Sequence, residues 1–254
     1  MDELHDQAWF EDYFGPDYLK IDFQPNTGRE VAFMQDVLEL EAGSRFLDAA
    51  CGYGRHAIPL AESGVDVVGC DLSAFMLKKA QDGVHASSIA ENGGSISFAR
   101  CDLRELPFEC EFDAASIMFN SFGYFQREDE NFRVLASIAD SLKPGGLFLL
   151  DLVNRDFLLR TPHEKDWFER NGTVILEEKH FDAVRNRSEI DVHVVDGGKK
   201  RSYHHSIRLY SLSELSMLLE ASGLAVENVY GGFESELFDW NKDRMLIVSR
   251  RMDD

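Results

Sequence analysis

Residues 45–71, RFLDAACGYGRHAIPLAESGVDVVGCD, constrain the fold more than any other stretch of the chain. A short apolar run ends at Asp48, and small residues then alternate with larger ones as far as Gly52 and Gly54. Apolar residues recur at helical spacing, and a second apolar run leads to Asp71. The pattern predicts strand, glycine turn, helix and parallel strand, with the turn and Asp71 at the sheet edge where open α/β sheets bind ligands.

The acidic residues beside the turn narrow the class of ligand. A carboxylate at the end of the second strand, Asp71, can accept both hydroxyls of a ribose. A dinucleotide would call for G-x-G-x-x-G, but His56 and Ala57 follow Gly54 and the third glycine is absent. Asp48 would repel a pyrophosphate and attract an ammonium group. A ribose that carries an amino acid in place of a phosphate is found in S-adenosyl-L-methionine (SAM).

Four motifs in order resemble those of class I SAM-dependent methyltransferases. They are the glycine turn and its acidic partner in residues 47–73, Arg-Cys-Asp-Leu at 100–103, Phe-Asp at 112–113, and Leu-Lys-Pro-Gly-Gly-Leu-Phe at 142–148. The resemblance spans residues 28–155. It implies a Rossmann-like α/β fold, with a seven-stranded, mostly parallel sheet, helices on both faces and an antiparallel β insertion. Another nucleotide-binding Rossmann-like domain is the alternative.

The resemblance also implies roles for individual residues. Asp102 would accept the adenine amino hydrogen while the Leu103 amide serves a ring nitrogen; the alternative for Asp102 is a cap of the turn 103–106. Asn120 and Ser121 would hold the amino-acid end of SAM. The predicted cofactor-binding residues are Tyr13, Tyr18, Asp48, Ala50, Gly52, Gly54, Arg55, Asp71, Leu72, Met76, Asp102, Leu103, Asn120 and Ser121.

The segment Asn-Ser-Phe-Gly-Tyr at 120–124 indicates the kind of acceptor. It lacks the two prolines of the amide and DNA methylases and resembles the segment of glycine and sugar N-methyltransferases. In glycine N-methyltransferase an arginine grips the substrate carboxylate, and Val153 occupies that place here. Arg155 would do a similar job or pair with Asp156, and the pairing is favoured. The acceptor-site candidates are Tyr124, Asn154, Arg155 and Arg208.

The chain is predicted to be one domain, residues 1–254, with two additions. Residues 1–26 are rich in aromatics and read either as a lid over the cofactor, with the Tyr13 and Tyr18 hydroxyls near the methyl donor, or as a helix packed on the domain edge. Residues 167–211 read as an antiparallel insertion of three strands, 173–181, 188–195 and 201–210, over the acceptor site. In the last strand, period two places residues 203, 205, 207 and 209 on one face and 204, 208 and 210 on the other; which face looks inward is left open.

Helix caps are predicted at two places. Thr27 and Glu30 have the spacing of a capping box, followed by a helix to about Glu41. Ser213 is predicted to cap a helix over residues 215–221.

Composition excludes several classes of function. A formal net charge of −20 opposes binding to nucleic acid. No apolar run approaches membrane-spanning length, and the acidic N-terminus has no signal-peptide pattern, so a cytoplasmic protein is expected. Four cysteines without C-x-x-C spacing read as reduced, and no residues have metal-ligand spacing.

The resulting functional hypothesis is methyl transfer from SAM to a small molecule. An amine needs only to be neutral when it attacks, whereas a hydroxyl needs a general base, and the sequence singles out no catalytic base. A small amine or amino sugar is therefore the first choice of acceptor. A small O-acceptor and a SAM-binding module without catalysis are the alternatives, and the sequence carries no indication of oligomeric state.

Overall fold

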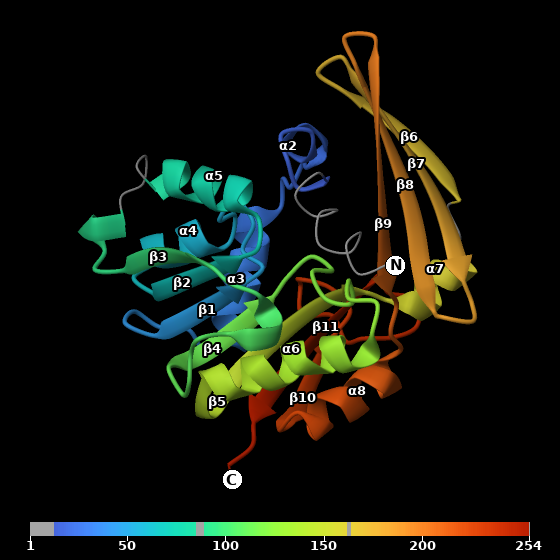
Figure 1. Cartoon of the computed structure of the whole chain (residues 1–254). Helices are drawn as coiled ribbons and strands as arrows, with labels where there is room; N and C mark the ends of the chain where they lie inside the picture. Colours follow the sequence, from blue (N-terminus) through green and yellow to red (C-terminus); the bar gives the residue numbers. More distant parts are fainter. Residues whose placement is uncertain (1–12, 85–88, 162–163, 254) are drawn as a thin grey trace.

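The computed structural model describes residues 13–84, 89–161 and 164–253 (Figure 1). Its centre is a seven-stranded sheet in the order β10-β11-β5-β4-β1-β2-β3. The strands are β1 Arg45–Ala49, β2 Asp66–Asp71, β3 Ser95–Arg100, β4 Phe112–Ile117, β5 Leu142–Val153, β10 Leu224–Tyr230 and β11 Arg244–Arg251. β11 pairs antiparallel with β5 and β10, while β1 to β5 pair in parallel. The predicted fold class is confirmed.

Helices cover both faces of this sheet (Figure 1). α3 Thr27–Val37, α4 Ala57–Glu62 and α5 Ala74–Val84 lie on one face, and α6 Glu128–Ser141 and α8 Leu212–Ala221 on the other. The short elements are α2 Tyr18–Ile21, α7 Arg155–Arg160, η1 Ile89–Glu91 and η2 Leu103–Glu105.

Each face has its own apolar core because successive strand residues point to opposite sides. In β1, Phe46 packs in the cluster of α3 and α4, and Leu47 in the cluster of α6 and α8. Both side chains are fully buried. Burial on both faces explains why the parallel strands read as nearly continuous apolar runs.

A second, antiparallel sheet stands beside the first, in the order β6-β7-β8-β9 (Figure 1). Its strands are β6 Lys165–Arg170, β7 Thr173–Asp182, β8 Arg187–Asp196 and β9 Lys199–Arg208. The expectation of three strands was wrong by one, because the mostly polar β6 is held by its pairing with β7 rather than marked by apolar alternation. The turn at Gly197 and Gly198 has φ of 55° and 76°, as a two-residue hairpin requires.

One face of this second sheet is buried, and it is therefore the inner face. Ile175, Val192 and Val194 are fully buried and form a third apolar cluster with Tyr13. Tyr203 packs against the same cluster, and His205 on the same face of β9 is buried.

Both predicted helix caps need correction. Asn26 precedes α3 without a side-chain cap, and the Thr27 hydroxyl donates to the Gln24 carbonyl at 3.1 Å. Glu30 does not reach back along the helix, because it pairs with Arg55 and His56 instead. α3 ends at Val37 rather than near residue 41.

α8 is capped two residues earlier than expected. Its N-cap is Ser211, which forms a complete capping box with Glu214. Ser213, the predicted cap, lies inside the helix.

Candidate functional site

The sheet order reverses between β1 and β4, because the chain runs from β1 outward to β3 and returns to β4 on the other side of β1. In open α/β sheets ligands bind at the carboxyl ends of the strands beside such a reversal. We call the carboxyl ends of β1, β2 and β4 the switch-point edge. The turn after β1, residues 50–56, is the glycine turn.

The small residues of the glycine turn have different physical roles. Ala50, Gly52 and Gly54 all have positive φ, at 63°, 54° and 80°. A Cβ at Gly52 would meet no atom within 4 Å, so the backbone there faces open space in which a ligand can lie close. A Cβ at Gly54 would lie 3.2 Å from Ile58 and Ala80, so that glycine allows the turn to pack on two helices.

Asp71 ties the end of β2 to the glycine turn. Its Oδ2 accepts a hydrogen bond from the Gly52 backbone N–H at 2.8 Å, and its Oδ1 accepts one from the Ser73 N–H at 2.7 Å. Burial raises the pKa of this carboxyl group, and the two backbone donors oppose that shift. The ribose role of Asp71 stays a prediction.

Asp48 lies at the end of β1, beneath the glycine turn. Its side chain is 1% exposed, and burial raises its pKa to about 6, against the opposing charges of His56 and Arg55. Its Oδ2 has no hydrogen-bond partner among the described residues. A buried carboxylate oxygen without a donor fits an incoming ammonium group. Together with the open space at Gly52, this oxygen makes the edge fit the amino-acid end of SAM.

Asp102 and its neighbours follow β3. The Asp102 carboxylate caps η2, accepting from the Arg104 backbone N–H at 2.9 Å, and pairs with the Arg104 guanidinium. The capping alternative is thus present in the structure, and the adenine role of Asp102 and Leu103 stays a prediction. Leu72, next to Asp71, accepts from Arg100 Nε through its carbonyl at 2.9 Å, and Met76 is buried.

The segment after β4 has a strained backbone. Phe119 and Asn120 have φ of 57° and 58°, a conformation that costs non-glycine residues energy and occurs at functional sites. Asp151 holds it, with Oδ2 accepting from the Phe119 N–H at 2.9 Å and its carbonyl accepting from the Asn120 N–H at 3.0 Å. Asn120 Oδ1 accepts from the Val153 N–H, and the Ser121 hydroxyl donates to Met118 O at 2.7 Å. The cofactor role of Asn120 and Ser121 stays a prediction.

Aromatic rings gather where this segment meets the inner face of the second sheet. The Tyr13 ring lies 4.6 Å from the His205 ring, and Tyr124 lies 6.3 Å from both His205 and Phe14. We call Tyr13, Phe14, Tyr124 and His205 the aromatic cluster. Burial raises the pKa of Tyr13 and Tyr124 and lowers that of His205 to about 4, so all three are neutral near pH 7.

The described part of the predicted lid connects the aromatic cluster with the switch-point edge. The Ser73 hydroxyl donates to Phe14 O at 3.3 Å, and the Tyr53 hydroxyl donates to Asp22 at 2.8 Å. Tyr18 packs edge-on against Phe14 at 5.0 Å. Residues 1–12 of the predicted lid lie outside the described residues.

Three acceptor-site candidates are engaged elsewhere. Asn154 caps α7 and donates to Lys242 O at 2.8 Å. Arg155 pairs with Asp156 and Glu214, which confirms the predicted Asp156 pairing. Arg208 pairs with Glu128 and Glu214. These contacts favour structural roles over acceptor binding for the three residues.

The surroundings of three residues near the site, His205, Glu30 and His56, differ from what local sequence patterns indicate. The alternation in β9 leaves open which of its two faces looks inward. Only the packing of the sheet shows that the face with His205 does. Glu30 was assigned to a helix cap, and His56 was read only as the residue that breaks the dinucleotide pattern. An available signal for Glu30 is its position three and four residues before Phe33 and Met34, on the apolar face of α3, where an exposed glutamate is not expected.

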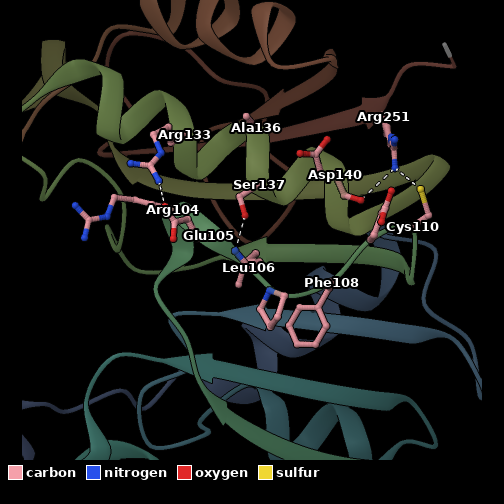
Figure 2. A pocket seen from close by; sticks show the side chains of 12 residues that line it. Arg104, Glu105, Leu106, Phe108, Cys110, Arg133, Ala136, Ser137, Asp140 and Arg251 are labelled. Atoms are coloured by element: carbon pink, nitrogen blue, oxygen red, sulfur yellow. Dashed lines mark hydrogen bonds and ion pairs between the residues drawn. The ribbon is translucent and has the colours of Figure 1, made fainter.

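A hollow of about 570 Å³ lies away from this edge, between η2 and α6 (Figure 2). Its lining contains no residue of the glycine turn. Arg133 there pairs with Glu105, and Arg251 Nη1 contacts Cys110 Sγ at 3.1 Å. In Figure 2, dashed lines also join Ser137 to the Leu106 N–H and Arg251 to the Asp140 carbonyl.

Two kinds of feature are absent from residues 13–84, 89–161 and 164–253. No helix there is long and apolar enough to cross a membrane. In the same ranges no three His, Cys, Asp or Glu side chains are grouped to hold a metal ion.

Comparisons with known proteins agree with this geometry. Residues 46–146 match a family described as a methyltransferase domain. A glycine/sarcosine N-methyltransferase from Halorhodospira halochloris is 33% identical over 237 residues, covering 91% of this chain and 84% of that protein.

Solved structures share the fold over nearly the whole chain. The CcbJ methyltransferase from Streptomyces caelestis superposes with a TM-score of 0.81 at 22% identity, covering 98% of this chain and 97% of the other. SAM-bound CalS10, an amino pentose methyltransferase from Micromonospora echinaspora, gives 0.64 at 18% identity over 93% and 95%.

Proposed function

This chain belongs to the SAM-dependent methyltransferases, and on that premise we propose that its methyl acceptor is a small amine without a carboxylate group. SAM supplies a methyl group on a positively charged sulfur. The observation that carries the acceptor proposal is the neutral aromatic cluster beside the switch-point edge.

The protein's contribution to such a reaction is alignment and exclusion of water. Asp71 is suited to the ribose hydroxyls and Asp48 to the ammonium group of the cofactor. On the acceptor side, the buried ring of Tyr13 and the half-buried ring of Tyr124 provide an apolar wall in which an amine loses water more easily in its neutral form than as an ammonium ion. The neutral His205 ring can accept a hydrogen bond from the amine and orient its lone pair.

The arginines near the aromatic cluster argue against a carboxylate on the acceptor. Within the described residues, Arg155 and Arg208 are paired with glutamates, and Arg244 is paired with the buried Asp151. Arg187 is buried and donates to the carbonyls of Tyr124, Phe125 and Ser206. An acceptor carboxylate would have to break one of these pairings.

A second candidate, an amino acid, is favoured by one observation. The glycine/sarcosine N-methyltransferase of H. halochloris is 33% identical over 91% of this chain. The place of the substrate-gripping arginine is Val153 here, so this chain would need another cation for the same substrate.

We also propose roles for the N-terminal segment and the second sheet, and a location for the protein in the cell. Residues 1–26 act as a lid and the second sheet covers the acceptor. The net charge of −20 favours a small molecule over nucleic acid, and the chain acts in the cytoplasm.

A panel of acceptors tests the proposal. The purified full chain is incubated with SAM and, separately, with free amino sugars, simple alkylamines, glycine, sarcosine and catechol, and mass spectrometry detects a gained methyl group. We expect methylation of an amino sugar or alkylamine and none of glycine or sarcosine. Methylation of glycine would establish the second candidate, and methylation of catechol alone would overturn the choice of nitrogen.

The role of His205 is tested with the acceptor found in that panel. In His205→Phe the ring remains and its nitrogens are lost, so we expect the acceptor KM to rise about tenfold, the scale of one hydrogen bond. The affinity for S-adenosylhomocysteine should stay unchanged. His193→Phe, on the outer face of the same sheet, is the matched control and should leave both unchanged.

A further inference from the structure

Three polar side chains with little exposed surface, Glu30, Arg55 and His56, lie together at the end of the glycine turn. Glu30 of α3 is 2% exposed, and its Oε2 contacts Arg55 Nη1 and, at 2.8 Å, His56 Nε2. The Arg55 Nη1 also donates to the Thr27 hydroxyl at 3.1 Å. A single carboxylate oxygen thus joins α3 to two consecutive residues of the glycine turn.

A buried carboxylate is costly unless its charge is matched. Glu30 meets this condition because both partners are cationic or can become so, and the pKa of Glu30 is lowered by them against the effect of burial. The contacts that stabilise the buried Glu30 carboxylate also restrain the positions of Arg55 and His56. The restraint acts on the last two residues of the glycine turn.

On their other side, Arg55 and His56 face groups of the switch-point edge. Both lie close enough to lower the pKa of Asp48, the carboxylate with an unpartnered buried oxygen among the described residues. The Arg55 guanidinium lies over the Phe119 ring at 4.4 Å, beside the strained backbone after β4. Arg55 is therefore held between Glu30 on one side and this edge on the other.

The amino-acid end of SAM carries one ammonium and one carboxylate group. Asp48 offers a negative group for the first, and Arg55, whose two hydrogen bonds given above both use Nη1, has further N–H groups for the second. We propose that Glu30 is a positioning residue of the cofactor site, which fixes Arg55 and His56 so that Arg55 and Asp48 meet the amino-acid end of SAM. The inference rests on SAM as the ligand of this edge and is independent of the acceptor.

The test compares two ligands that differ only in the part Glu30 is proposed to serve. S-adenosylhomocysteine carries the amino acid, and 5′-methylthioadenosine lacks it. Calorimetry on the full chain measures both dissociation constants for the wild type and for Glu30→Gln. We expect the affinity of Glu30→Gln for S-adenosylhomocysteine to fall about tenfold or more, the scale of a hydrogen bond to a charged group. Its affinity for 5′-methylthioadenosine should change less than about twofold.

A structural role alone would weaken both ligands together, so parallel losses would overturn the inference, as would no change in either. Glu111→Gln is the matched control: it removes a glutamate paired with Arg45 at the opposite end of the sheet and should leave both affinities unchanged. If Glu30→Gln fails to fold, Arg55→Lys keeps the charge but loses the planar fork, and the same selective loss is required of it.

The possible failures can be told apart. A wild type that binds neither ligand would remove the cofactor premise. A wild type that binds both but methylates no amine would remove only the proposed acceptor. If Glu30→Gln weakens both ligands equally, only the role proposed for Glu30 is removed.

Discussion

At the scale of residues, the carboxylates of Asp48 and Asp71 lie at neighbouring strand ends, Asp48 buried and Asp71 half-buried, and their surroundings differ. Asp71 accepts two backbone hydrogen bonds, whereas Asp48 has an oxygen without a partner in the described part of the chain. The Asp71 carboxylate is held by backbone donors and can accept further hydrogen bonds from a ribose. The Asp48 carboxylate has an oxygen that can pair with a cation. Their roles should therefore respond differently to pH and to substitution.

Asp48 should make cofactor binding depend on pH. Its pKa in the free protein is about 6, raised by burial and by Asp71 and opposed by His56, Arg55 and the Ala57 backbone. An ammonium ligand favours the ionised form, so affinity should be level above about pH 6 and fall as the pH drops below it, by at most about tenfold per unit. Calorimetry with S-adenosylhomocysteine between pH 5 and pH 8 checks this. An unchanged affinity over that range, or the same slope in Asp48→Asn, would contradict it.

Asp71→Asn should weaken cofactor binding while the fold is retained. The amide keeps an oxygen for one backbone donor but loses the charge that favours ribose hydroxyls, so we expect a loss of about tenfold to a hundredfold in affinity for S-adenosylhomocysteine. Asp66→Asn is the control, because Asp66 begins the same strand at its far end and bonds to Ser95. Equal affinities in the two variants would remove Asp71 from the ribose.

At the scale of elements, the segment 119–125 connects the two sheets. The Arg208 N–H donates to Gly123 O at 2.8 Å, which fastens the segment to the end of β9. Arg187 of β8 donates to Phe125 O at 3.0 Å and Tyr124 O at 3.2 Å. The second sheet thus determines where Tyr124 lies, although Tyr124 follows a strand of the first.

Gly123→Ala should disrupt this junction. Gly123 has φ of 98°, and a Cβ there would lie 2.6 Å from the Arg208 carbonyl oxygen, so β9 would have to shift. Gly43→Ala is the matched control, with φ of 85° and no atom within 4 Å of its Cβ, and it carries only the cost of the left-handed conformation, about 1–2 kcal/mol. Thermal unfolding should show a larger loss for Gly123→Ala, and equal losses would contradict the clash.

At the scale of the whole molecule, the switch-point edge is assembled from parts far apart in the chain. The glycine turn, Asp71 and the segment after β4 come from the first sheet, while residues 13–26 and the second sheet close on them from outside. Ligand binding should therefore stabilise the entire chain against unfolding rather than one element.

Cofactor binding should raise the melting temperature by a predictable amount. At a free concentration one hundred times its dissociation constant, S-adenosylhomocysteine should add about 2.7 kcal/mol, or roughly 5–10 °C for a chain of this size. NADH should produce no shift, because Asp48 repels its pyrophosphate. A shift with NADH and none with S-adenosylhomocysteine would contradict the cofactor assignment.

Much of the first sheet, and the alternation of β9 in the second sheet, could be predicted because these signals are local. The glycine turn, Asp71 and the alternation within β9 are properties of a few neighbouring residues, and the structure agrees with each. β6 was missed because its mostly polar strand is held by pairing with β7. The capping role of Glu30 was a wrong prediction because a capping box is a local pattern, and the Arg55 guanidinium is a stronger partner for a carboxylate than a backbone N–H.

The sequence alone determined the strand-turn-helix-strand unit and the acidic residues that flank it, because backbone conformation and side-chain period depend on residues a few positions apart. Tertiary structure decided which face of β9 looks inward, that Glu30 meets His56 across 26 positions, and that Arg208 is paired with Glu128 80 positions away. Those choices depend on which charges and rings come together when distant segments pack. The partner of a buried charged side chain is the group that folding brings next to it. No short pattern of residues encodes the distance between two such groups.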